Sequence, residues 1–485
     1  MNDNTVKQRA VTGFIWRFCQ NAGTQFVNFM VSIVLARILM PADYGLVAMI
    51  TVFINIAMVF INTGFSSSIV QKKDLSETDK STMFFASVLM GVILYAVLFF
   101  SAPAISVFYK QPRLCELLRI EGLLVLICSF YSVHQALVIR NLEFKKSFMA
   151  SLAGTVVHGI SGITMALLGF EVWALVFSTL LDYTVCAIVM WIVVKWRPKL
   201  VFAPKSFKSM FSFSFKILIS GLIDSIFNNI RSIIIGRQYS SADLAYYNRG
   251  YQFPTLIMSH VDGSMTTVLF SSLSKFQSNW EEGLHVLRRA MRTSIFICAP
   301  LMAGMFAVSK PMILLLLTDK WADSVQYVRM VCVICIFWPL TAQRHALNSL
   351  GKSGVSLTLN IVGKIMALAA IFATYRISVR VMIMSTIATS FVSAVIGMIV
   401  YSKHLNYTVK QQLTDVVPSL LLAAFMGVCV WCVQLLNLPP AATLLIQLPV
   451  GFIVYAGLAK LLKFESFDFA LNLVKGIIMK KKAQS

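Results

Sequence analysis

The chain has 485 residues, of which 58% are hydrophobic and 13% are charged, and its mean hydropathy is +0.77. Soluble domains contain about 45–50% apolar and about 25% charged residues. The composition therefore excludes a soluble globular protein, as well as disordered and disulfide-rich classes, and leaves a polytopic membrane protein. The 42 Lys and Arg residues exceed the 20 Asp and Glu residues, an excess that the positive-inside rule explains without a nucleic-acid partner.

Hydropathy predicts an all-α protein with fourteen membrane spans, since about 20 apolar residues cross a bilayer. The first span follows a short polar segment and has no small-residue cleavage site, so we expect it to be retained rather than removed as a signal peptide. The connections are too short for a sizeable extramembrane domain. The predicted spans are 12–36, 44–69, 82–109, 114–139, 147–169, 171–194, 209–236, 243–272, 290–317, 325–348, 355–375, 378–401, 416–436 and 441–462.

The distribution of Lys and Arg predicts the orientation. With a cytoplasmic amino terminus, 27 of these residues lie on the cytoplasmic side, 11 on the opposite side and four within spans. Positive loops stay preferentially in the cytoplasm. An even number of spans then places both termini in the cytoplasm.

An internal repeat relates the two halves of the spanning region. Residues 26–45 and 226–245 are identical at six of twenty positions, and both stretches cover the end of an odd-numbered span and the loop after it. Six spans per half is an even number, so the halves have the same orientation and a substrate site is expected between them. The predicted division is an N-terminal six-helix lobe (1–194), a basic cytoplasmic linker (195–208), a C-terminal six-helix lobe (209–402), two appended helices (403–463) and a basic cytoplasmic tail (464–485).

Polar side chains recur at helical spacing along the two spans that the repeat relates. A charged residue at mid-membrane depth costs about 2.5–3.5 kcal/mol on insertion scales, so lipid cannot face these stripes. We expect them to line a hydrophilic, net cationic cavity between the lobes, and the alternative is internal ion pairing that only holds helices together. The stripes are Arg17, Asn21, Thr24, Gln25, Asn28 and Ser32 in the first span, and Lys216, Ser220, Asp224, Asn228 and Arg231 in the seventh.

Further polar residues lie within other predicted spans and are functional candidates by the same argument. Arg249 and Asp262 belong to the eighth span, Asn360 and Lys364 lie four residues apart in the eleventh, and Asp182 lies in the sixth. Coupling to H⁺ or Na⁺ requires a carboxylate inside the bilayer. Asp224 is the first candidate for this role because cations flank it on its stripe, and Asp182 and Asp262 are the next candidates.

Other chemistries find little support. Two Cys-x-x-Cys pairs lie in the middle of apolar runs without a nearby His, which favours small apolar packing residues over a metal site. Gly351-Lys352-Ser353 ends like a phosphate-binding loop but lacks the earlier glycine. We therefore expect no cofactor, no metal and no enzymatic activity.

The runs LARILMPADYGLVAM (35–49) and TGFSSSIVQ (63–71) resemble bacterial polysaccharide exporters of the O-antigen, colanic acid and teichuronic acid type. These are the Wzx-type flippases of the multidrug/oligosaccharidyl-lipid/polysaccharide (MOP) superfamily, and the resemblance extends over the whole chain. It implies two lobes in a V, with a central cavity that alternates between inward-open and outward-open states. The implied substrate is an undecaprenyl-pyrophosphate-linked oligosaccharide.

The resemblance also implies roles for individual residues. Arginine and lysine are strong charge-assisted donors to phosphate, so by position the pyrophosphate would be bound by Arg17, Lys216, Arg231, Lys364 and Arg249. Asn21, Gln25, Asn28, Asn228 and Asn360 would line the cavity. Membrane lipid would hold the acyl tail, and polysaccharide polymerase and assembly proteins are the expected partners at the bacterial inner membrane.

Three alternatives remain open on the sequence. A lipid II flippase would share the fold and carry another head group. A drug/cation antiporter of the MATE type would typically have twelve spans and acidic cavity residues. A scaffold for envelope-assembly enzymes would not need polar stripes.

Overall fold

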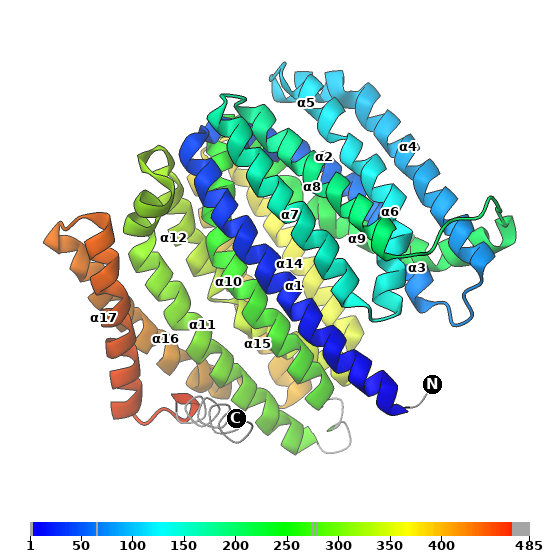
Figure 1. Cartoon of the computed structure of the whole chain (residues 1–485). Coiled ribbons are helices and arrows are strands. Elements are labelled where there is room, and N and C mark those ends of the chain that lie inside the picture. Colours follow the sequence, from blue (N-terminus) through cyan, green and yellow to red (C-terminus); the bar gives the residue numbers. More distant parts are fainter. Residues whose placement is uncertain (1–2, 65, 274–275, 277–279, 468–485) are drawn as a thin grey trace, which may run out of the picture. The chain divides into compact units, whose positions relative to one another are not determined.

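The computed structural model describes residues 3–64, 66–273, 276 and 280–467, and Figure 1 shows its helices in chain order. Helices account for the regular structure of this part of the chain, and no strand occurs in it. The α-helices are α1 (Asp3–Ile38), α2 (Pro41–Gly64), α3 (Ser66–Gln71), α4 (Glu77–Tyr109), α5 (Leu114–Glu121), α6 (Leu123–Arg140), α7 (Phe144–Leu167), α8 (Val172–Val193), α9 (Pro204–Gln238), α10 (Ser241–Leu273), α11 (Trp280–Leu317), α12 (Ser324–Cys335), α13 (Ala342–Ser349), α14 (Ser353–Thr374), α15 (Val379–Leu405), α16 (Val409–Cys432) and α17 (Pro440–Leu461). The 3₁₀ helices are η2 (Asp319–Trp321), η3 (Trp338–Thr341) and η4 (Val433–Leu436).

Twelve helical segments among the described residues are long and apolar enough to cross a membrane. They correspond one by one to twelve of the fourteen predicted spans, which confirms a polytopic all-α membrane protein. The other two predicted spans coincide with α1 and α10, which are long helices but carry polar residues along their length. Within α1 the apolar stretch is Gly23–Ile38, which is short for a span, so the count of fourteen remains a prediction.

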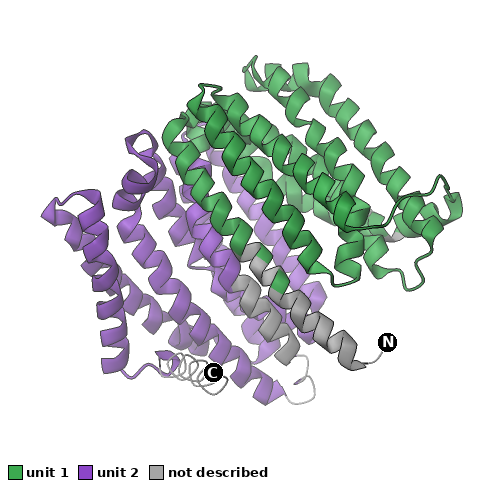
Figure 2. Cartoon of the chain, in the orientation of Figure 1, with its two compact units in different colours: residues 1–245 green, residues 246–485 purple. Residues whose placement is uncertain are grey.

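The chain divides into two compact units, residues 1–245 and 246–485 (Figure 2). We describe each unit by itself. The first unit includes α9, because α9 packs against α2, α3 and α4. The predicted lobe boundaries at 194/195 and 208/209 are drawn from the internal sequence repeat, whereas the two compact units are defined by packing. The lobe boundaries therefore remain predictions.

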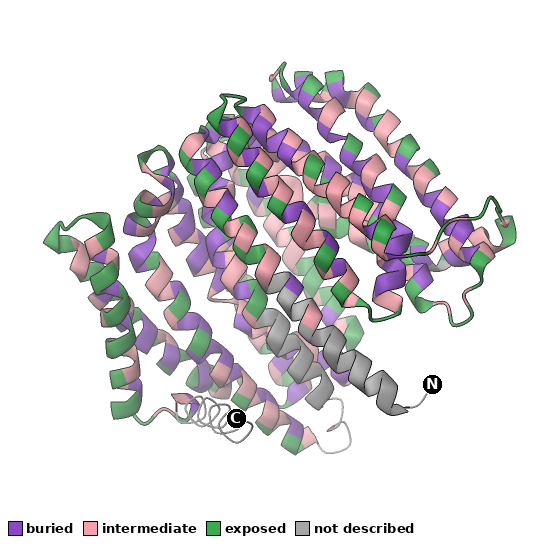
Figure 3. Cartoon of the chain, viewed as in Figure 1, coloured by how far each residue is buried: buried purple, intermediate pink, exposed green. Residues whose placement is uncertain are grey.

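The first unit has its apolar core where α1, α7 and α8 meet and where α3, α4, α6 and α9 meet. Val31 and Leu35 of α1 pack with Ala174 of α8 in one cluster. Ile69, Phe84 and Met210 belong to the other. Figure 3 shows buried and exposed positions mixed along most helices, as expected where one face meets protein and another meets lipid.

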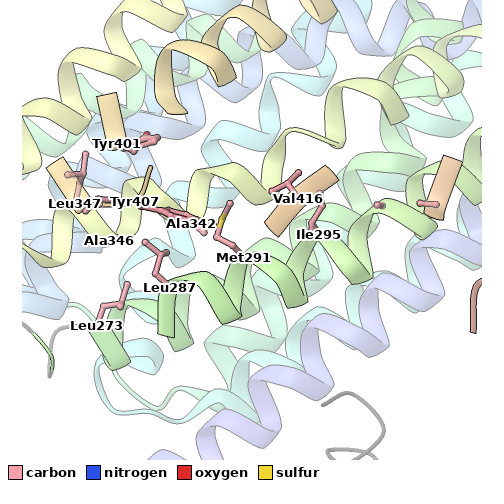
Figure 4. Packing of buried hydrophobic residues seen from close by; sticks show 13 residues of the cluster. Leu273, Leu287, Met291, Ile295, Ala342, Ala346, Leu347, Tyr401, Tyr407 and Val416 are labelled. Atoms are coloured by element: carbon pink, nitrogen blue, oxygen red, sulfur yellow. The ribbon is translucent and has the colours of Figure 1, made fainter. Parts of the chain in front are cut away.

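The second unit is built around α11. A cluster of thirteen buried residues joins α11 to α13, α15 and α16, and Figure 4 shows Met291 and Ile295 of α11 close to Val416 of α16. A smaller cluster adds α17, where Val450 and Val454 pack against Met426. The predicted appended helices, α16 and α17, therefore pack on α11 of their own unit.

The repeat is visible in how its helices begin and end. α1 ends at Ile38 and α2 begins at Pro41, while α9 ends at Gln238 and α10 begins at Ser241, the same break at an offset of 200 residues. Asp43 accepts a hydrogen bond from the Met40 backbone N–H at 3.1 Å, and Asp243 accepts one from Ser240 at 3.1 Å. Such contacts satisfy N–H groups that a helix start leaves free, so the matched aspartates fix the two helix starts.

Proline residues within helices leave carbonyl groups without an intrahelical donor, four residues earlier in the chain. In three cases a side chain from elsewhere donates to this carbonyl. Arg119 Nε donates to Phe99 O, which precedes Pro103, at 3.4 Å. In α11, Tyr455 Oη donates to Phe296 O, which precedes Pro300, at 2.7 Å. Gln434 Nε2 donates to Ala307 O, which precedes Pro311. Each of these carbonyl groups thus has a donor, as the hydrocarbon interior of a membrane requires.

Replacing Tyr455 by phenylalanine is expected to destabilise the protein by about 1–3 kcal/mol, the cost of a buried polar group left unsatisfied. The ring, whose centroid lies 5.1 Å from that of Phe296, would remain in place. Tyr375→Phe removes an exposed hydroxyl that accepts a hydrogen bond from Arg376 and serves as the control. Thermal unfolding in detergent measures both, and equal midpoints for the two variants would contradict the role of Tyr455.

The basic linker is held against the start of α4. The Lys199 N–H donates to Ser81 Oγ at 3.0 Å, and the Ala203 N–H donates to Thr82 Oγ1 at 3.1 Å. Ser206 Oγ, in the first turn of α9, donates to Asp79, which also pairs with Lys72 at 2.6 Å. These contacts fix where α9 begins.

Candidate functional site

The polar stripe of α1 lies on a different face from the one that packs against α7. Gln20 Nε2 donates to Ser147 Oγ at 3.0 Å and to Ser151 Oγ at 2.9 Å. Further along, a Cβ atom at Gly159 would lie 2.7 Å from Val31 Cγ2, so the absence of a side chain there lets the two helices approach closely. Gln25 and Asn28 are left exposed. Arg17 and Asn21 belong to α1, but their side chains lie outside the described residues.

The stripe of α9 is also exposed. Leu218 and Gly236 of α9 are buried inside the first unit. A Cβ atom at Gly236 would lie 2.9 Å from the Tyr109 ring of α4. Lys216, Asp224 and Asn228 are exposed on α9. The same unit therefore contributes the exposed polar residues of both repeat-related helices.

Arg231 differs from the rest of the α9 stripe because it is half-buried. Its Nε atom is buried and makes no hydrogen bond to any described residue. A buried N–H donor without an acceptor is costly, and a guanidinium presents its donors in a fixed fork that fits phosphate. Among the predicted anion-binding residues, Arg231 thus offers an unused donor.

The remaining predicted residues of the second unit have mixed surroundings. Arg249 is 7% exposed, its Nη1 donates to Gln252 Oε1 at 2.9 Å, and its guanidinium carbon lies 5.3 Å from the centre of the Trp321 ring. These contacts give Arg249 a packing role beside any role in binding. Lys364 is half-buried and Asn360 is exposed on α14.

The predicted ion-coupling carboxylates do not share one environment. Asp224 belongs to the exposed stripe of α9, whereas Asp182 is half-buried in α8 beside α7. A Cβ atom at position 154 would lie 2.2 Å from Asp182 Oδ1, so a glycine is needed there. Asp262 lies outside the described side chains. The described residues contain no group of three or more His, Cys, Asp or Glu that could hold a metal ion.

Sequence reasoning missed two acidic residues with unusual surroundings. Asp415 of α16 has a fully buried side chain that binds Arg288 at 2.8 Å and Arg292 at 2.7 Å, both on α11, and accepts a hydrogen bond from Tyr407 Oη at 2.7 Å. Burial and the Asp415 carboxylate raise the pKa of Tyr407 above its usual value, so this hydroxyl remains a donor. The other missed residue is Glu121, which is 3% exposed. The sequence feature that could have revealed Glu121 is an acidic residue within an apolar run.

These features define a class of protein: a polytopic α-helical membrane protein in which two helices related by an internal sequence repeat carry exposed polar side chains. A family model described as "Polysaccharide biosynthesis protein" matches residues 34–326. The chain belongs to this family.

Individual relatives agree with the family. The chain is 25% identical over 320 residues to the succinoglycan biosynthesis transport protein ExoT of Rhizobium meliloti, covering 66% of this chain and 65% of that protein. It is 27% identical to the teichuronic acid biosynthesis protein TuaB of Bacillus subtilis, over 58% of each, and 21% identical to the lipopolysaccharide biosynthesis protein WzxC of Escherichia coli, over 68% of each. The matches thus span less than two thirds of the first two relatives.

Solved structures confirm the fold. The lipid II flippase MurJ in an inward-closed conformation superimposes with a TM-score of 0.71 at 15% identity, over 93% of this chain and 98% of that one. An inward-facing multidrug transporter of the MATE family gives a TM-score of 0.62 at 16% identity, over 80% and 96%. The chain therefore has the fold of the MOP superfamily.

Proposed function

We propose that this protein flips an undecaprenyl-pyrophosphate-linked oligosaccharide across the bacterial cytoplasmic membrane by alternating access. The observation that carries the proposal is the exposed polar face of α9, where Lys216 lies exposed and Arg231 keeps a buried N–H donor that no described residue accepts. A polar face inside a membrane segment is costly unless water or a polar ligand meets it. The family, with its polysaccharide-export relatives, supports a glycan as that ligand.

In this proposal the basic residues bind and orient the head group. Lys216 and Arg231 on α9, with Arg17 on α1, neutralise the pyrophosphate through charge-assisted hydrogen bonds. The amides Gln25, Asn28 and Asn228 are both donors and acceptors, as sugar hydroxyls require. The acyl tail stays in lipid while the head group crosses, so no covalent chemistry is needed and the protein is not an enzyme.

The substrate is tested by complementation of bacterial strains that lack their own flippase and make a defined glycan. Export restored in a strain that makes a polysaccharide repeat unit supports the proposal. Rescue of a strain depleted of its lipid II flippase, without restored polysaccharide export, would identify lipid II as the substrate. Extrusion of cationic drugs without either rescue would identify an antiporter of the MATE type.

Both termini and the 195–208 linker are expected in the cytoplasm, because 27 Lys and Arg residues lie on that side and 11 lie on the other. Alkaline phosphatase, which is active only outside the cytoplasm, should be inactive when fused after residue 205 or 485. The same fusion after residue 376, between α14 and α15, should be active and serves as the control. An active fusion at 205 or 485 would overturn the orientation.

A further inference from the structure

The linker between α8 and α9 carries an apolar tip that the other described residues do not cover. Leu200 is 94% exposed, and its neighbours Val201 and Phe202 are also exposed. All three lie outside the helices, in the segment that leads from α8 to α9. Contiguous apolar side chains that stay exposed mark places where a protein meets another molecule or a membrane.

Hydrogen bonds to the start of α4 fix the backbone on both sides of this tip. The Lys199 N–H donates to Ser81 Oγ at 3.0 Å, and the Ala203 N–H donates to Thr82 Oγ1 at 3.1 Å. Within the tip, the Val201 N–H donates to Lys199 O at 2.7 Å. A loop that is held in this way loses little conformational entropy when it binds a partner. The apolar tip is therefore preformed.

The tip lies close to the level at which the neighbouring membrane spans begin and end. The span formed by α8 ends at Val193, and the apolar span within α9 begins at Ser214. A row of aromatic rings connects the tip to the span of α9. Successive ring centroids lie 6.1, 5.3 and 5.8 Å apart along Phe202, Phe207, Phe211 and Phe215. Aromatic side chains are enriched where lipid head groups meet hydrocarbon, so we place the linker at the membrane surface.

Cations surround the tip and have no carboxylate that neutralises them. Residues 195–205 contain no Asp or Glu. The two acidic residues near them, at the start of α4, have other partners, since Glu77 pairs with Lys80 and Asp79 pairs with Lys72, both at 2.6 Å. Lys199 interacts with Glu77 only at longer range. Four exposed cations lie within five residues of Leu200 and form no ion pair with a described carboxylate: Lys195, Arg197, Lys199 and Lys205.

The positive-inside rule accounts for cations in a loop between two spans, but it does not require an apolar tip among them. The two features together match a leaflet that contains anionic lipid. Lys and Arg are attracted to such a surface, and apolar side chains enter the boundary between head groups and acyl chains. We infer that residues 195–205 form a docking surface for anionic phospholipid of the cytoplasmic leaflet. The tip enters the head-group region, and the four cations contact lipid phosphates.

This inference depends on the proposed orientation and not on the proposed function. Because α9 begins at Pro204, next to the tip, lipid bound to the docking surface holds the start of this helix at the membrane surface. Lys216 follows 12 residues later, which corresponds to about 18 Å along an α-helix. The bound lipid therefore fixes the depth at which the polar face of α9 lies.

Lipid binding to the purified full chain tests the docking surface. Native mass spectrometry with added phosphatidylglycerol or phosphatidylcholine should show that the wild type prefers phosphatidylglycerol. Replacing Lys195, Lys199 and Lys205 together by glutamine should lower the affinity for phosphatidylglycerol by roughly tenfold or more, since each cation near anionic lipid adds to the attraction. Arg197 is left in place because its guanidinium carbon lies 5.2 Å from the centre of the Trp191 ring, and its loss would disturb packing.

A matched control removes the same charge elsewhere. Lys403, Lys410 and Lys460 are exposed in the second unit and are also expected on the cytoplasmic side, and replacing these three by glutamine should leave the affinity unchanged. A fluorescent amino acid in place of Leu200 reports on the tip. In phosphatidylglycerol nanodiscs it should be quenched by a lipid-bound quencher and protected from a water-soluble one. In phosphatidylcholine nanodiscs this protection should fall.

Each outcome decides. Equal binding of the two lipids by the wild type, or equal losses in the linker variant and the control, would overturn the inference. A probe at position 200 that stays open to the water-soluble quencher in phosphatidylglycerol would also overturn it and would favour a protein partner for the tip. If the linker variant fails to fold, the wild type is compared at low and high salt, because salt screens exposed charges. A preference for phosphatidylglycerol that does not shrink with salt would then refute the role of the cations. Preferential binding in a protein that flips no glycan would support the docking surface and refute only the proposed function.

Discussion

Lys216→Ala and Arg231→Ala are each expected to reduce glycan export by roughly 10- to 150-fold while membrane abundance stays near normal. Each substitution removes a charge-assisted contact to the pyrophosphate, and hydrogen bonds to charged groups contribute about 1.5–3 kcal/mol. The expectation is sharper for Arg231, because its buried Nε makes no hydrogen bond to any described residue and is therefore available to a phosphate oxygen. Export is measured by surface glycan in a strain that lacks its own flippase.

Lys208→Ala provides the matched control for these variants. Lys208 is exposed near the start of the same helix and is expected on the cytoplasmic side. The Lys208→Ala protein should therefore export glycan normally. Normal export by Lys216→Ala and Arg231→Ala would refute the cationic site. Equal losses in all three variants would indicate a general effect of charge, and loss of the variants from the membrane would favour a structural role for the stripe.

Asp415→Asn is expected to lower the free energy of unfolding by about 3 kcal/mol, the lower end of the range for breaking a buried ion pair. The Asp415 side chain is fully buried and neutralises Arg288 and Arg292, whose side chains are 22% and 33% exposed. Because the arginines retain some contact with solvent, the cost should not reach the upper end. Thermal unfolding in detergent measures the change.

Glu465→Gln separates the buried contact from ordinary surface pairing. Glu465 pairs with Arg292 at 2.7 Å but is 83% exposed, and exposed pairs contribute at most about 1 kcal/mol. We expect this variant to unfold close to the wild type. An Asp415→Asn protein that unfolds at the wild-type temperature would show that the network does not hold α11 to α16.

The sequence predicted most of the fold because hydropathy is a local property. Twelve spans follow directly from it. The remaining two helices, α1 and α10, have polar residues where an apolar run is needed, and this same feature marked their positions as candidates for function. The repeat was also readable, since the loop between α1 and α2 and its counterpart 200 residues later need the same aspartate to start a helix.

The sequence did not reveal partners that lie far apart along the chain. The prolines of α11 predict kinks, but nothing local shows that Tyr455, 159 residues from Phe296, supplies the missing donor. Asp415 lies next to the predicted start of a span and looks like an interfacial residue, and its arginines lie 123 and 127 residues away. For Arg249, the sequence could show a charge within a span but not the Trp321 ring beneath it.

The two side chains that donate to the carbonyl groups preceding the prolines of α11 limit how this architecture can be shortened. Gln434 and Tyr455 come from η4 and α17, so a chain ending after α15 would leave Phe296 O and Ala307 O without their donors in hydrocarbon. A twelve-helix protein built on the same repeat must lack prolines at positions 300 and 311, supply other donors, or straighten the helix. The C-terminal pair is therefore an integral part of the second unit, and its loss in evolution would require compensating changes in α11.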